Sequence, residues 1–144
     1  MIRGLILLLF NLVFALFVWL MMYFPGWDIM ASLLYVGFIC WEARVLKLSG
    51  LKTKQIFGIA LVAQLPGLIL EALAIWYWYR YGPVTSDFDF VLQMWNTPFV
   101  PLISLFAWPR VFNVALGYLG IYLCSPFYIL AMTGWGYLSR RPTQ

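Results

Sequence analysis

The chain has 144 residues, of which 65% are apolar, 20% aromatic and only 10% charged, and its mean hydropathy is +0.90. A water-soluble domain of this length has too little interior to bury so much apolar surface, so the composition excludes that class of protein. The formal net charge of +4 comes from basic residues beside apolar runs, which indicates membrane topology and lipid head-group contacts instead of nucleic-acid binding. We therefore expect an all-α integral membrane protein with a single polytopic domain over residues 1–144.

The first half of the chain contains three apolar runs that predict membrane-spanning helices. The first run covers 4–24 and ends at the turn dipeptide Pro25-Gly26. It has no small-residue cleavage site, so we expect a retained span and not a signal peptide. The second span covers 29–43 and the third covers 56–79, on either side of a polar loop at 47–55.

The second half of the chain leaves the number of spans open between four and five. The run 111–138 predicts a span that is tilted or kinked at Pro126. The segment 90–108 is apolar enough to cross, but it contains Pro98 and Pro101, which would free backbone groups inside a helix. We favour four transmembrane helices, with 90–108 as a Pro-broken re-entrant or interfacial element between the third and the fourth. Five transmembrane helices are the alternative.

The distribution of basic residues supports the four-span arrangement. Four spans place seven of the nine basic residues on one side of the membrane, whereas five spans place six of them there. Short cytoplasmic loops carry the excess of lysine and arginine, so the arrangement with the more uneven distribution of basic residues is favoured. We expect a multi-pass protein of a bacterial inner (cytoplasmic) membrane, with both termini in the cytoplasm.

Glu71 is the first candidate functional residue, because it is a lone carboxyl group in the middle of the third span. An ionised side chain at that depth costs roughly 2.5 to 3.5 kcal/mol on insertion scales, so such residues are rare and mark functional sites. Gln64 lies two turns before it on the same helix face. We expect Gln64 and Glu71 to form an intramembrane proton, ion or packing site, and Pro66-Gly67 to bend the helix beside it.

Small residues share this face of the third span and recur in the last span. At spacings of three and four residues, such stripes let the backbones of neighbouring helices approach closely in lipid. The predicted packing residues are Ala60, Gly67 and Ala74 in the third span and Asn113, Gly117 and Gly120 in the last. We expect these two helices to pack against each other, with Gln64 and Glu71 available to neighbouring helices.

We expect the other polar candidates to have structural and not catalytic roles. Asn11 is expected to form a hydrogen bond between helices, and Glu42 is expected to reach the interface and pair with a lysine of the following loop. The triplet Asp87-Phe88-Asp89 has the Asp-x-Asp form of glycosyltransferase metal sites. Three residues are too few to be specific, and we interpret the triplet as part of a solvated loop.

The residue types present in the sequence exclude several kinds of catalytic and ligand-binding site. The sequence has no histidine, which removes Ser-His-Asp and Cys-His nucleophiles, histidine-ligated haem and His-based zinc sites. It also has no Gly-rich phosphate loop followed by Lys-Ser or Lys-Thr. We expect no enzymatic activity, no cofactor and no bound metal.

Two functional hypotheses remain. The leading one is a non-enzymatic subunit or assembly factor of a membrane complex. Its partners are the lipid bilayer and either other membrane protein subunits or further copies of the chain. The alternative is a homo-oligomeric, proton- or cation-coupled small transporter or channel in which Glu71 of each copy meets at a shared pathway.

Overall fold

The computed structural model describes residues 2–82, 87–105, 110–111 and 114–139. Its elements in chain order are α1 (Ile2–Met21), α2 (Trp27–Leu48), α3 (Thr53–Tyr81), α4 (Asp87–Trp95), α5 (Val100–Ser104), β1 (Arg110–Val111), β2 (Val114–Ala115), α6 (Leu116–Tyr122) and α7 (Cys124–Leu138). The two short strands pair antiparallel, with Arg110 opposite Ala115. Apart from this pairing the elements are helices, so the predicted all-α fold class is confirmed.

Three of the helices are long and apolar enough to cross a membrane, judged by length and composition: α1, α2 and α3. They contain 20, 22 and 29 residues. At 1.5 Å per residue they extend over roughly 30, 33 and 44 Å, compared with a hydrocarbon core of about 30 Å. The helices are therefore those of a multi-pass membrane protein, and α3 is considerably longer than a perpendicular span requires.

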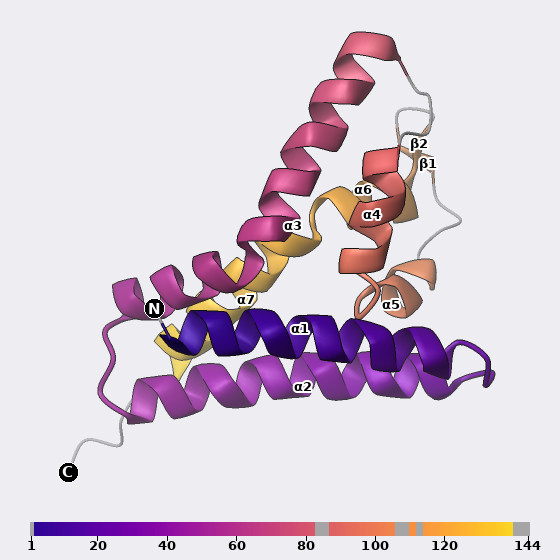
Figure 1. The fold of residues 1–144 in the computed structure, drawn as a ribbon. Coiled ribbons are helices and arrows are strands. Elements are labelled where there is room, and N and C mark those ends of the chain that lie inside the picture. The colour runs from indigo at the N-terminus through magenta and orange to yellow at the C-terminus, as the bar shows by residue number, and fades with distance from the viewer. Residues whose placement is uncertain (1, 83–86, 106–109, 112–113, 140–144) are drawn as a thin grey trace.

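Four helix ends gather at one end of the molecule (Figure 1). At that end α1 begins, α2 ends, α3 begins after a short loop, and α7 ends. From there α1 and α2 run antiparallel and side by side, while α3 diverges from them and α7 packs against both α2 and α3. The short helices α4, α5 and α6 lie between the second half of α3 and the pair formed by α1 and α2 (Figure 1).

The direction of α3 changes along its length (Figure 1), and the helix contains Pro66 in its interior. A proline has no backbone N–H, and its ring clashes with the carbonyl group four residues earlier, so an internal proline kinks a helix. The bend lets the two halves of α3 meet different neighbours. The helix as a whole packs against α1, α7 and α4.

The second helix is longer than the sequence indicated. The predicted span 29–43 and loop 47–55 are replaced by a helix that continues to Leu48 and a loop of only four residues before Thr53. Glu42 and Arg44 thus lie within the helix and do not mark its end. The helix ends where Gly50 adopts a positive φ of 88°, a conformation that closes many helices.

The last predicted span, 111–138, is not one continuous helix. In its place the structure has β1, β2, α6 and α7, with Leu123 between the two helices. Pro126 explains the break, because it cannot donate a hydrogen bond to the carbonyl group of Tyr122, the last residue of α6. The kink expected at Pro126 is thus a complete interruption of the helix, and α7 starts afresh at Cys124.

The segment 90–108 is broken, as its prolines indicated. Residues 106–108 lie outside the described part of the chain, and the remainder forms most of α4 and all of α5. These helices have nine and five residues. Neither is long enough to cross a membrane on its own.

A single apolar core joins α1, α2, α3 and α7. The buried residues of α1 recur at spacings of three and four; they are Gly4, Leu7, Asn11, Ala15 and Val18. At Gly4 the helices approach closely, because a Cβ atom there would lie 2.9 Å from the side chain of Val62 and 3.1 Å from the carbonyl oxygen of Ile59, both in α3. The glycine is thus what brings the start of α1 against α3.

Candidate functional site

The predicted site face of α3 points into the protein. The structure buries five residues of this face, whereas Trp78, at the spacing that continues it, is 50% exposed. The buried residues are Ala60, Gln64, Gly67, Glu71 and Ala74. The exposed fraction of Glu71 is 4% and that of Gln64 is 1%, so both polar side chains lie away from the surface. Each of them must therefore find its hydrogen-bond partners inside the chain.

The carboxyl group of Glu71 lies at the first turn of α7. Its Oε1 atom accepts a hydrogen bond of 3.0 Å from the backbone N–H of Ser125, the second residue of that helix. The first backbone N–H groups of a helix have no partner within the helix, and the helix dipole favours a negatively charged acceptor there. Glu71 thus caps a helix through a residue, Ser125, that lies 54 positions later in the chain. The break caused by Pro126 creates the helix end that Glu71 caps.

Gln64 makes the second polar contact of this face. Its Oε1 atom accepts a hydrogen bond of 3.0 Å from the indole Nε1 of Trp95, the last residue of α4. This bond is buried and fixes the end of α4 against the middle of α3. The amide and the carboxyl group on one face of α3 therefore hold two different helices.

Gly67 lies between Gln64 and Glu71 and lets both partners reach α3. A Cβ atom at this position would lie 2.5 Å from Nε1 of Trp95 and closer still to Oγ of Ser125. Real side chains do not tolerate such distances, so α4 and α7 can pack this closely against α3 only if residue 67 is glycine.

Asn96 adds a third polar side chain near the carboxyl group. It is 1% exposed, its side chain lies close enough to interact with Glu71, and its Nδ2 donates a hydrogen bond of 2.9 Å to the carbonyl oxygen of Ile121 in α6. The hydroxyl group of Ser125 is also fully buried next to the carboxyl group. We refer to the five residues Gln64, Glu71, Trp95, Asn96 and Ser125 as the Glu71 cluster.

Of the predicted packing residues of the last span, the structure describes the surroundings of Gly120 alone. Asn113 lies outside the described residues, and Gly117 is in α6, at a position whose surroundings the structure does not describe. The atoms closest to a Cβ at Gly120 belong to Ile103 of α5, at 2.9 Å and beyond. The close pairing with α3 is made by α7 through Ser125, because the break at Leu123 separates the faces of α6 and α7.

Two other polar residues have partners that the sequence did not indicate. Glu42 forms an ion pair with Arg3 at the start of α1, with an N···O distance of 3.9 Å, and not with a lysine of the following loop. Asp89 belongs to α4 and not to a solvated loop; it is 8% exposed and accepts a hydrogen bond from the hydroxyl group of Tyr122.

Over residues 2–82, 87–105, 110–111 and 114–139, no group of three or more metal-binding side chains is found.

Asn11 connects α1 to α2, as an interhelical hydrogen bond was expected to do. Its Oδ1 atom accepts a hydrogen bond from the hydroxyl group of Tyr35. Both residues are almost completely buried, and Tyr35 belongs to the apolar core. The bond places a polar pair in the centre of the contact between the first two helices.

Comparison with family models, with curated proteins and with solved structures finds no match for this chain. What the Glu71 cluster does must therefore be argued from its geometry. The cluster joins α3 to α4 and α7 and lies in the interior of the protein. Its carboxyl group has a hydrogen-bond donor in place at Ser125.

The first prediction concerns Glu71 as a cap. Glu71→Leu leaves the N–H of Ser125 without an acceptor in a buried position, so we expect it to lower the free energy of unfolding by about 1–3 kcal/mol. Glu71→Gln keeps an acceptor oxygen at the same place and is expected to stay near the wild-type value. Thermal unfolding of the purified variants in detergent measures both. A leucine variant as stable as the glutamine variant would show that the cap contributes nothing.

A second prediction tests the close approach at Gly67. Gly67→Ala forces Trp95 and Ser125 away from α3, and we expect a loss of roughly 1–3 kcal/mol from overpacking. Gly58→Ala is the matched control on the same helix, because a Cβ atom there meets nothing within 4 Å. We expect the control to be neutral or slightly stabilising, since alanine is the better helix former. Equal melting temperatures for the two variants would contradict the packing described here.

Proposed function

We propose that the protein is a small, non-enzymatic, multi-pass membrane protein that acts by associating with other membrane proteins, as a subunit or an assembly factor of a larger complex. The observation that carries this proposal is the engagement of Glu71 within its own chain. The carboxyl group is 4% exposed and caps α7. Glu71, the first candidate functional residue of the sequence, therefore already stabilises the packing of two helices. The polar chemistry of the interior is used to hold the helices together.

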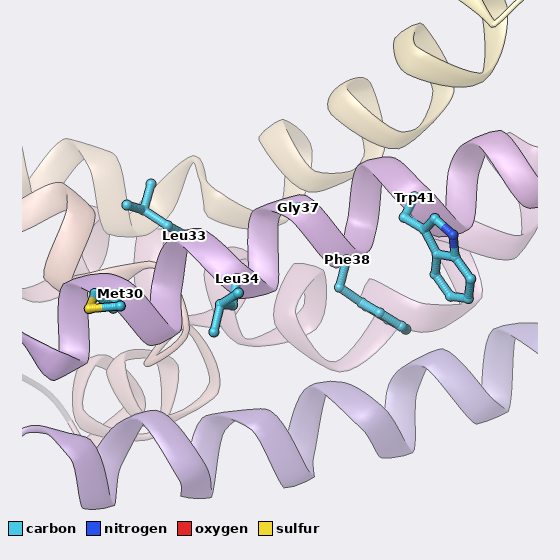
Figure 2. Close-up of a pocket in the computed structure, with 6 residues that line it drawn as sticks. All are labelled: Met30, Leu33, Leu34, Gly37, Phe38 and Trp41. Atoms are coloured by element: carbon cyan, nitrogen blue, oxygen red, sulfur yellow. The ribbon is translucent and has the colours of Figure 1, made fainter.

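The outer surface supports the same proposal, because it is apolar over much of α1 and α2. On α2 a shallow hollow of about 490 Å³ is lined by six residues of that helix alone, shown in Figure 2: Met30, Leu33, Leu34, Gly37, Phe38 and Trp41. Gly37 has no role in packing within the chain, since a Cβ atom there meets nothing within 4 Å. Surfaces of this kind in lipid contact acyl chains or the helices of partner proteins.

We further propose four crossings of a cytoplasmic membrane, with α6 and α7 together as the fourth and both termini in the cytoplasm. The gathering of basic residues near the start of α1, the end of α2 and the start of α3 supports this orientation, and α7 ends in the same region (Figure 1). In this arrangement α4 and α5 form a re-entrant or interfacial element in the outer half of the protein.

The competing function is a homo-oligomeric transporter or channel coupled to protons or cations. It requires Glu71 side chains from several copies to face a shared pathway. The burial of Glu71 between α3 and α7 of one chain weighs against that arrangement. The two functions make different demands on this residue, because a coupled transporter needs a group that titrates and a packing site needs only a hydrogen-bond acceptor.

A third prediction follows from association. Native mass spectrometry of the protein, extracted gently from its own host membrane, is expected to show a reproducible heterologous membrane partner. The complex is expected to survive Glu71→Gln, which keeps the cap, and to be lost with Glu71→Leu. A homo-oligomer alone, together with proton- or cation-coupled flux in reconstituted vesicles that Glu71→Gln abolishes, would overturn the proposal in favour of transport.

The topology gives a fourth prediction. A reporter that is active only in the cytoplasm is expected to be active when fused after Gln144 and inactive when inserted at Pro25-Gly26, between α1 and α2. These two positions lie on opposite sides of the membrane in the proposed arrangement. An external C-terminal reporter would require a different number of crossings.

A further inference from the structure

Basic side chains from three helices meet at the end of the molecule where α1 begins and α2 ends. They are Arg3 of α1, Arg44 and Lys47 of α2, Lys52 of the following loop and Lys54 of α3. Lys47 is half-buried and the other four are exposed. We call this group the basic end.

Little of this positive charge is neutralised within the protein. In the portion of the chain that the structure covers, the one ion pair joins Arg3 to Glu42 at 3.9 Å, and half of the Arg3 side chain remains exposed. The remaining four basic residues have no acidic partner there. The basic end therefore attracts anions from its surroundings.

The basic end lies at the depth where phospholipid head groups are found. Trp41 of α2 and Trp135 and Tyr137 of α7 are 59%, 47% and 61% exposed, and each lies in the last turns of its helix before the same end. Exposed tryptophan and tyrosine side chains prefer the boundary between hydrocarbon and water. The basic groups just beyond them are then level with lipid phosphates.

An exposed apolar side chain lies on the membrane side of the basic residues. Phe57, three positions after Lys54 in the first turns of α3, is 45% exposed. A ligand that carries both a phosphate group and an acyl chain would contact the basic side chains and Phe57 at once. A soluble anion would use only the charges.

We propose that the basic end is a binding surface for anionic phospholipids, with Arg44, Lys52 and Lys54 contacting the phosphate groups and Phe57 contacting the acyl chains. The surface takes phospholipids of net negative charge in preference to zwitterionic ones. This binding is separate from the association proposed above and does not depend on the Glu71 cluster.

The test uses the full chain in nanodiscs made from equal amounts of phosphatidylglycerol and phosphatidylcholine, with retained lipids identified by native mass spectrometry. Wild-type protein is expected to retain phosphatidylglycerol preferentially. Because each basic residue near the surface changes the affinity for anionic lipid about fivefold, the triple variant Arg44→Gln, Lys52→Gln, Lys54→Gln is expected to reduce the preference roughly a hundredfold. Arg80→Gln, at the opposite end of α3, is the matched control and is expected to leave it unchanged.

Two results would overturn the proposal. One is equal retention of the two lipids by the wild-type protein, or equal preference in the wild-type protein and the triple variant. The other is complete displacement of phosphatidylglycerol by millimolar inorganic phosphate at constant ionic strength, which would mean that the surface binds phosphate without needing the acyl chain. Loss of the preference in the triple variant, with the control and the melting temperature unchanged, supports it.

Discussion

The fold depends on the bond between Glu71 and the first turn of α7. A helix that begins inside a membrane protein leaves backbone N–H groups that water cannot reach, and each of them needs an acceptor from the protein itself. Pro126 interrupts the last apolar run and so creates this need at Ser125. Glu71 meets it, and in doing so positions α7 along α3. The helix break leaves a backbone N–H group without a partner, and the carboxyl group of Glu71 provides the acceptor for it.

The same principle operates at three other buried polar residues, where aromatic side chains act as the donors. Tyr35 donates to Asn11, Trp95 to Gln64 and Tyr122 to Asp89. Each pair joins two different helices. Tyrosine and tryptophan fill much apolar volume and still carry one polar hydrogen, so they satisfy an amide or carboxyl oxygen without bringing a further charge into the interior. The high aromatic content thus contributes to the specificity of packing as well as to the membrane boundaries.

The long helices and the inward face of α3 could be predicted from the sequence, because both depend on local patterns of residues. Apolar runs revealed α1, α2 and α3, and residue spacing placed Gln64, Gly67 and Glu71 on one face. The end of α2 was placed too early, since hydropathy reports depth in the membrane while the helix stops at Gly50. The partners Trp95, Asn96 and Ser125 were missed because contacts between residues far apart in the chain leave no spacing pattern. Pro126, next to Ser125, was the available signal for a new helix end.

The long separation between Glu71 and Ser125 has a consequence for biosynthesis. The chain is made from its N-terminus, so Glu71 of α3 is synthesised before the residues that begin α7. During that interval the carboxyl group has no cap to bind, and a nascent chain stopped before residue 124 carries it unsatisfied in an apolar environment. Incomplete molecules thus differ from finished ones in a carboxyl group that lacks its hydrogen-bond donor at Ser125.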